Sequence, residues 1–179
     1  MPLALGEDDS PRDRRNNGPV TPDVDGWTAL FRLLLAAACG GLVGIEREAD
    51  GQDAGLRTHM LLALGAAMFG LVSVGGFNDH IRPSASTNVQ VDVTRVASYV
   101  AAGVGFIGGG AILKHRTGVS GLTTAASLWV AAAAGVACGV GLWVAPLAAV
   151  AITLLALVVL KPASRWLAGR RASQRRVSP

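Results

Sequence analysis

Long apolar stretches separated by short polar segments occupy most of this chain. About 20 mostly apolar residues are enough to span a bilayer as an α-helix, and windows of that kind fall at residues 27–45, 58–77, 95–113, 121–139 and 142–160. We therefore expect an all-α integral membrane protein, a bundle of about five transmembrane helices. The last two windows form one apolar run that is too long for a single crossing at about 1.5 Å per residue. Gly139, Gly141 and Pro146 are its breakers, so we expect the chain to turn there.

Both ends of the chain are polar. Residues 1–26 contain four prolines and no continuous apolar core, so they cannot bury enough apolar surface to fold alone and do not resemble a signal peptide. We expect a disordered tail over 1–26, a transmembrane domain over 27–160 and a basic tail over 161–179. The first helix would then also serve as the insertion signal.

Composition and charge agree with a membrane protein and indicate its orientation. The chain is 51% hydrophobic, with 23 glycines and a mean hydropathy of +0.44, well above an ordinary soluble domain. All 12 acids lie at or before Asp92, whereas nine of the 16 bases lie at or beyond Arg95. If the C-terminus is cytoplasmic, Arg82 is the only base in an outer loop between helices, so the positive-inside rule predicts an outer N-terminus and a cytoplasmic C-terminus. The basic tail suits anionic lipid better than nucleic acid, since it has one aromatic residue and no folded module.

Several motifs resemble those of the MgtC/SapB family of bacterial inner-membrane proteins. They are GGLVGIERE at 40–48, GLRTH at 55–59, Asp92-x-x-Arg95, GVGFIGGGAI at 103–112 and GLTTAASLW at 121–129. The resemblance covers roughly residues 27–160 and implies a multi-pass protein of the bacterial inner membrane. It departs from longer members because only 19 residues follow Leu160, too few for their C-terminal cytoplasmic domain. It also has Tyr99 where relatives often carry Gln.

The resemblance implies a role in magnesium homeostasis and adaptation to low Mg²⁺. Under one hypothesis the protein is a non-catalytic modulator of a membrane complex, with the F-type ATP synthase as the partner that the resemblance implies. The alternative is a small oligomeric transporter of Mg²⁺ or another cation. The first is favoured because the predicted helices after Arg95 contain no carboxylate to bind and release a cation. Backbone carbonyls could substitute, so the alternative stays open.

No catalytic constellation is evident, and we expect neither an enzyme nor a cofactor. His59, His80 and His115 fall at boundaries on different sides of the membrane, and no Ser or Cys has an evident His partner. The string GVGFIG at 103–108 spells a dinucleotide fingerprint. It lacks the preceding strand and the downstream acid that the fingerprint requires.

Polar residues at the predicted membrane boundary are the first candidates for function. Glu46, Arg47 and Glu48 close the first helix, and Arg57, Thr58 and His59 open the second. Glu46 or Glu48 could pair with Arg57 and hold a helical hairpin. Alternatively, this surface is an interaction or ion-sensing patch, in which Glu46, Glu48, Asp50 and Asp53 would attract hydrated Mg²⁺. The sequence does not identify metal ligands beyond this possibility.

Further candidates lie on the third and fourth helices. Asp92 and Arg95 share one helical face at the outer entry to the third helix, where Asp92 could cap the helix or both could serve function. Thr123 and Thr124, with Ser127, could join helices through their hydroxyls. The glycines of 103–110, including Gly105, Gly108, Gly109 and Gly110, predict close packing at the bundle centre or an unwound segment that exposes carbonyls.

The two cysteines and one arginine raise separate expectations. Cys39 and Cys138 should differ in depth by about 15 Å, too far for a disulfide. Both are expected to be packing residues, although the family resemblance leaves a functional role open for Cys138. Arg32 is awkward inside the first helix. It should reach toward the outer headgroups, or the helix begins later.

Overall fold

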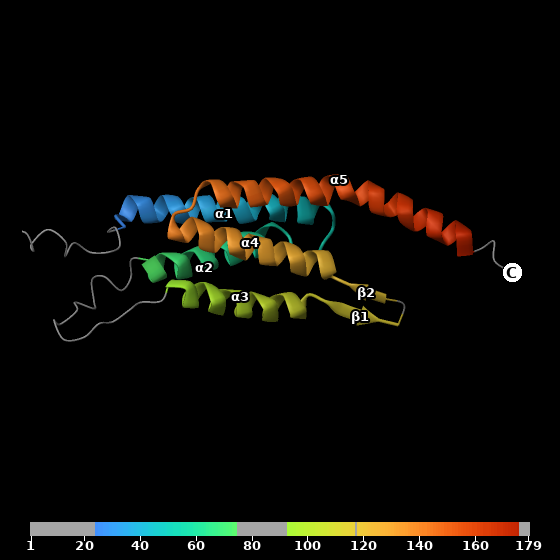
Figure 1. Ribbon diagram of the computed structural model, residues 1–179, viewed down its shortest axis with the longest axis horizontal. Helices are drawn as coiled ribbons and strands as arrows, with labels where there is room; N and C mark the ends of the chain where they lie inside the picture. The colour runs from blue at the N-terminus through green and yellow to red at the C-terminus, as the bar shows by residue number, and fades with distance from the viewer. Residues whose placement is uncertain (1–23, 75–92, 117, 176–179) are drawn as a thin grey trace, which may run out of the picture.

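A computed structural model of the protein describes residues 24–74, 93–116 and 118–175, so Asp92 and most of the predicted N-terminal tail lie outside the described residues. Within them the chain forms α1 (Gly26–Ala49), α2 (Leu56–Val74), α3 (Val93–Gly110), β1 (Leu113–His115), β2 (Gly118–Ser120), α4 (Leu122–Val140) and α5 (Val144–Arg175). The helices run along the long axis of the molecule (Figure 1). The predicted all-α membrane bundle is confirmed.

The helix lengths match membrane crossings in part. Among the described residues, α1, α2 and α4 are each long and apolar enough to span a membrane, and Val144–Leu160 of α5 is a shorter apolar stretch. The turn between α4 and α5 lies where it was predicted. Gly141 ends α4 with a φ of 92°, a left-handed conformation that glycine adopts without a Cβ clash. Beyond Leu160, α5 continues as a helix to Arg175 and projects past the other helices (Figure 1).

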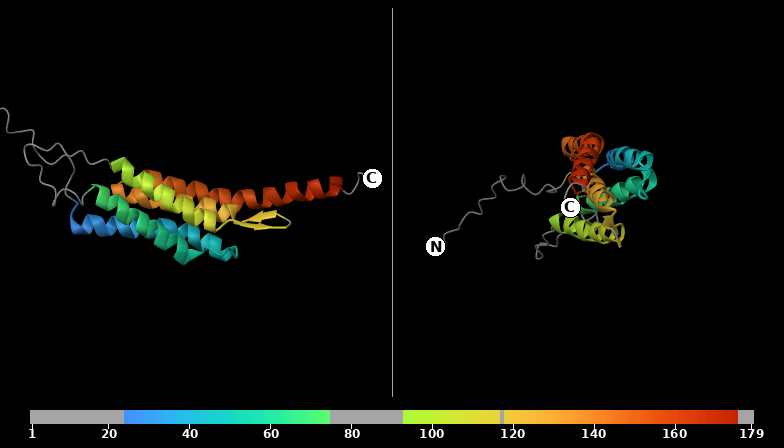
Figure 2. Two further views of the ribbon diagram at one scale, coloured as in Figure 1. Left: turned by 90° about the horizontal axis from the view of Figure 1, so that it is seen from below. Right: turned by 90° about the vertical axis from the view of Figure 1, so that its right-hand side faces the viewer.

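The centre of the bundle is α4, and the prediction that the third helix lies there is wrong. α4 contacts each of the other four helices, whereas α3 packs on α2 and α4 and lies at the edge in the end view (Figure 2). The glycines that allow close approach belong to the central helices. A Cβ at Gly135 of α4 would lie 2.9 Å from the Cα and carbonyl carbon of Ala63 on α2, and nearer still to its oxygen. Gly139 meets Ala67 in the same way.

The buried cluster between α1 and α4 corrects the prediction for the cysteines. Cys39 and Cys138 are both buried in one cluster, and their thiols lie near each other. The prediction treated the helix ends as level. Instead, the helices are staggered. Arg32 of α1 bonds Gly139 near the end of α4, so the residues of α1 before Arg32 extend past the end of α4. This stagger brings the two sulfur atoms to one depth.

Arg32 joins α1 to the end of α4, which corrects both expectations for it. α1 begins at Gly26, ahead of Arg32. The Arg32 Nη1 donates to the Gly139 carbonyl at 2.9 Å, where the last carbonyls of a helix lack intrahelical partners and the helix dipole is negative. Beside it, the rings of Phe31 and Trp143 pack with centroids 5.3 Å apart.

The basic segment between α3 and α4 contains a short antiparallel β-hairpin. Leu113 pairs with Ser120 and His115 with Gly118, and the described side chains of both strands are exposed. We call this end of the bundle, with β1, β2 and the α1–α2 turn at residues 50–55, the hairpin end (Figure 1). The α4–α5 turn lies at the opposite end.

Candidate functional site

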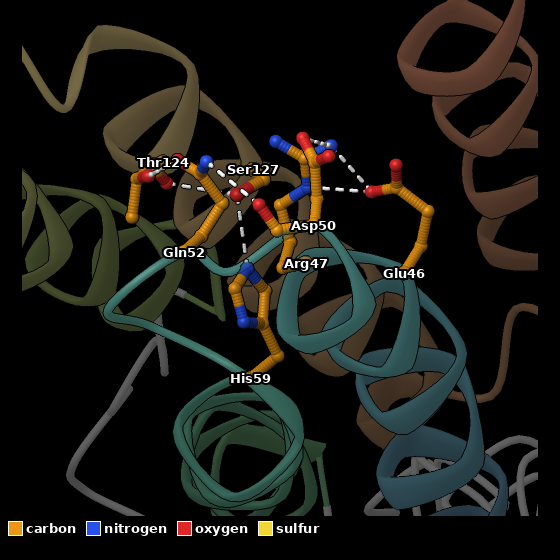
Figure 3. A network of polar contacts seen from close by, with 7 residues as sticks. All are labelled: Glu46, Arg47, Asp50, Gln52, His59, Thr124 and Ser127. Atoms are coloured by element: carbon orange, nitrogen blue, oxygen red, sulfur yellow. Dashed lines mark hydrogen bonds and ion pairs between the residues drawn. The ribbon is translucent and has the colours of Figure 1, made fainter.

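A network of polar side chains connects the α1–α2 turn, α2 and α4 near the hairpin end (Figure 3). Its centre is His59, which is fully buried at 0% exposure in the first turn of α2. The His59 Nδ1 lies 2.9 Å from the Gly55 carbonyl, and its Nε2 lies 2.9 Å from the Ser127 Oγ of α4. Ser127 Oγ donates to the Thr124 carbonyl at 2.8 Å, and Thr124 Oγ1 donates to Gln52 Oε1 at 3.2 Å. The network therefore joins the turn, α2 and α4.

The protons available in this network limit which bonds can form together. The carbonyls of Gly55 and Thr124 can only accept, so His59 Nδ1 and Ser127 Oγ must be the donors to them. The bond between Nε2 and Ser127 Oγ then needs a second proton on the imidazole. With a neutral ring, the hydroxyl has to choose between Nε2 and the Thr124 carbonyl. A cationic ring would allow all three bonds, but a charge fully buried beside Arg47 is costly, which favours the neutral ring.

A buried arginine ends α1 beside this network. Arg47 is only 3% exposed, and its guanidinium contacts Glu46 Oε2 at 2.5 Å and Asp50 Oδ2 at 3.7 Å. A buried cation is costly unless it is paired with charge and hydrogen-bonded. Glu46 and Asp50 therefore hold Arg47 in place at the start of the α1–α2 turn.

The turn itself is closed by a carboxylate and a backbone amide. Glu48 Oε2 accepts a hydrogen bond from the Leu56 N–H at 2.8 Å, where α2 begins and its first amides lack intrahelical acceptors. The predicted ion pair between Glu46 or Glu48 and Arg57 does not form. Arg57 is exposed and has no ion pair with the described residues. A carboxylate does hold the helical hairpin of α1 and α2, as one hypothesis proposed, but its partner is the Leu56 amide and not Arg57.

These contacts bear on the proposed attraction of Mg²⁺ to the turn. Glu46 and Asp50 are engaged by Arg47, and Glu48 by the Leu56 amide. Glu48 and Asp53 are the two exposed acids of the four. In the described part of the chain, no three His, Cys, Asp or Glu side chains gather as metal ligands would. The arrangement is suited to holding the turn.

The other sequence candidates lie apart from the network. Thr58 and Thr123 are exposed near the hairpin end, and Arg95 is exposed on α3 toward the opposite end. Cys138 lies in the α1–α4 cluster.

The glycines of α3 also lie away from the network. Gly108 packs against Ala125, whereas a Cβ at Gly105, Gly109 or Gly110 would meet nothing within 4 Å. α3 is a continuous helix over Val93–Gly110, so the suggested unwound segment is not present.

The pairing of His59 with Ser127 was missed from the sequence, where no Ser had an evident His partner. The two residues are 68 positions apart, and no local spacing links them. Both are buried, and Ser127 is also bonded to its own helix backbone, which fits a bond that joins helices rather than an activated nucleophile. Gln52 was missed as well. The Ser127 hydroxyl does join α4 to α2, as predicted, whereas the Thr124 hydroxyl joins α4 to the α1–α2 turn.

Comparison with known proteins agrees with the motifs. Residues 33–166 match the model of the MgtC family. The chain belongs to the MgtC family. It is 44% identical over 130 residues to YhiD of Escherichia coli K12, and the match covers 73% of this chain and 59% of YhiD. The name given to YhiD describes it as a proposed magnesium transporter. This membership and the apolar helices establish a membrane protein.

Two further relatives show how much of the family architecture the chain contains. It is 41% identical over 152 residues to SrpB of Synechococcus elongatus, covering 79% of this chain and 81% of SrpB. It is 38% identical over 136 residues to MgtC of Salmonella typhimurium LT2, covering 76% of this chain and 54% of that protein. This MgtC family member thus spans little more than half of YhiD and MgtC. No solved structure matches it.

Proposed function

We propose that this protein acts in magnesium homeostasis in the bacterial inner membrane, as a non-catalytic modulator that docks on another membrane complex. Family membership and the name of YhiD support the link to magnesium. The motif resemblance suggests the F-type ATP synthase as the partner. In the proposed orientation the hairpin end is cytoplasmic, because Arg47, Arg57, Lys114 and Arg116 lie there.

The observation that carries the docking proposal is the outward placement of the α3 glycines. α3 contacts the bundle through its Val104 and Gly108 side. On a different side, Ala102, Gly105 and Gly109 are exposed at three- and four-residue spacing, and a Cβ at either glycine would meet nothing within 4 Å. Such a flat face lets another helix approach closely in a membrane. We call Ala102, Gly105 and Gly109 the small face of α3.

The same placement weighs against the transporter alternative for a single chain. The central helices are in close contact at Gly135 and Gly139, whose Cβ positions are occupied by the backbone of α2. Gly105 and Gly109 face away from the bundle, so a path along α3 would need a second chain to enclose it. A modulator needs only the exposed face.

The test is ATP-driven proton pumping in inverted membrane vesicles, with and without this protein at matched expression. Gly105→Leu adds a bulky side chain to the small face, at a position where an added Cβ meets nothing within 4 Å. Ala151→Leu is the matched control, because Ala151 is exposed on α5. We expect wild type and Ala151→Leu to slow pumping, and Gly105→Leu to lose this effect.

Two results would contradict the proposal in different ways. If wild type leaves pumping unchanged, modulation of the ATP synthase is wrong, and Mg²⁺ flux in reconstituted vesicles becomes the next measurement. If Gly105→Leu slows pumping as strongly as wild type, the small face of α3 is not the docking surface.

A further inference from the structure

An open groove of about 610 Å³ runs between α2 and α3. Its walls are aliphatic and aromatic side chains, including Leu61 and Phe69 of α2 and Tyr99 and Phe106 of α3. The lining extends from Val96 to Ile107 on α3, which corresponds to about 16 Å of helix. The groove is thus long, apolar and open along the side of the bundle, in the size range of small-molecule sites.

Two glycines leave space in this groove. Gly65 of α2 and Gly103 of α3 both line it, and a Cβ at either would meet nothing within 4 Å. This differs from Gly135 and Gly139, where the missing Cβ allows helix contact. The missing side chains at Gly65 and Gly103 bring no described segment of the chain closer. They leave room for a separate apolar molecule.

An arginine lies on the same face of α2 beyond the groove, at its hairpin end. Arg57 precedes Leu61 by four residues, and Gly65 and Phe69 follow at the same spacing, so all four share one face of the helix. Arg57 is exposed, lies at the first turn of α2 and forms no ion pair with the described residues. A cation next to an apolar groove is complementary to a molecule with an anionic head and an apolar tail.

We propose that the groove binds an anionic phospholipid, with an acyl chain along α2 and α3 and its phosphate at Arg57. Basic residues at a membrane boundary attract anionic headgroups. A second copy of this face fits less well, because neither α2 nor α3 contains a carboxylate. A two-fold contact through the groove would bring the two copies of Arg57 together. The groove lies on a different side of α3 from Gly105 and Gly109, which do not line it.

Native mass spectrometry of the purified protein, titrated with phosphatidylglycerol or with phosphatidylcholine of the same chains, tests this site. Gly103→Leu fills the groove, and Arg57→Gln removes the cation. Gly105→Leu is the control, since it adds the same side chain at an equally open position of α3 outside the groove. We expect one phosphatidylglycerol to remain bound to wild type and to Gly105→Leu at higher affinity than phosphatidylcholine.

The two groove variants should differ in degree. Gly103→Leu should weaken phosphatidylglycerol binding at least tenfold, and Arg57→Gln about fivefold, the effect of one basic residue near an anionic surface. Equal binding of both lipids to every variant would overturn the proposal and indicate annular lipid only. A dimer that Gly103→Leu abolishes, without lipid selectivity in wild type, would instead assign the groove to a second copy. Unfolding midpoints measured on the same samples show whether each variant is folded.

Discussion

The contact between α2 and α4 can be tested with the smallest possible addition, one methyl group. Gly135→Ala places a Cβ 2.9 Å from the Cα and carbonyl carbon of Ala63, and closer to its oxygen. Ordinary contacts between carbon atoms are about 3.5–4.0 Å, so the helices would have to separate by roughly 0.6 Å or more. Overpacking of this kind typically costs about 1–3 kcal/mol. For a chain of this size, that corresponds to a fall in unfolding midpoint of roughly 2–12 °C.

Gly105→Ala is the matched control, because it makes the same substitution within a helix where nothing lies within 4 Å. Alanine is favoured over glycine in a helix by about 1 kcal/mol, so this variant should unfold at the wild-type midpoint or slightly above it. The opposite signs of the two effects separate packing from helix propensity.

The chain contains its own reporter for this measurement. Cys39 and Cys138 are buried, at 1% and 0% exposure, so a thiol-reactive fluorophore should label the purified protein in detergent only as it unfolds. The expected result is a lower midpoint for Gly135→Ala than for both wild type and Gly105→Ala. Equal midpoints for the two variants would refute the inferred close contact of α2 and α4 at Gly135.

Two further predictions concern side chains that meet across helices. Ser127→Ala leaves the buried His59 Nε2 without its 2.9 Å partner and should destabilise the protein by about 1–3 kcal/mol. The control Thr123→Ala changes an exposed position and should leave the unfolding midpoint unchanged. Equal unfolding midpoints for the two variants would argue against the bond between His59 and Ser127. A membrane-permeant oxidant should convert the neighbouring thiols of Cys39 and Cys138 into an intramolecular disulfide, seen by intact mass and by lost thiol labelling. Two free thiols after complete oxidation of a surface-thiol standard would contradict their proximity.

Much of the local structure could be predicted because it depends on local chemistry. Apolar windows predict helices because the backbone must satisfy its own hydrogen bonds in lipid. The break at Gly141 could be predicted because glycine adopts the left-handed conformation that ends α4 there. The helix boundaries were less certain. α5 continues well past Leu160, where the apolar pattern ends, because helix formation does not require an apolar face along its whole length.

The assignment of roles within the candidate site depended on long-range packing. The sequence pointed to the boundary residues Glu48 and His59, and to hydroxyls on α4, as candidates. It suggested Arg57 as the partner of Glu46 or Glu48, but in the folded turn Glu46 pairs with Arg47 and Glu48 accepts from the Leu56 amide. A carboxylate can bond an arginine or a helix N-terminus, and only the path of the turn decides between them.

The sequence by itself determined the class of the protein, its helices and its family, because these depend on composition, on apolar length and on motifs. Which helix lies at the centre was decided only by the tertiary structure. The glycines of α3 and α4 look alike in sequence, yet those of α4 contact α2 and several of those of α3 face outward. The physical reason is that a missing side chain permits close approach without specifying a partner. The partner is selected by the packing and stagger of all the helices together.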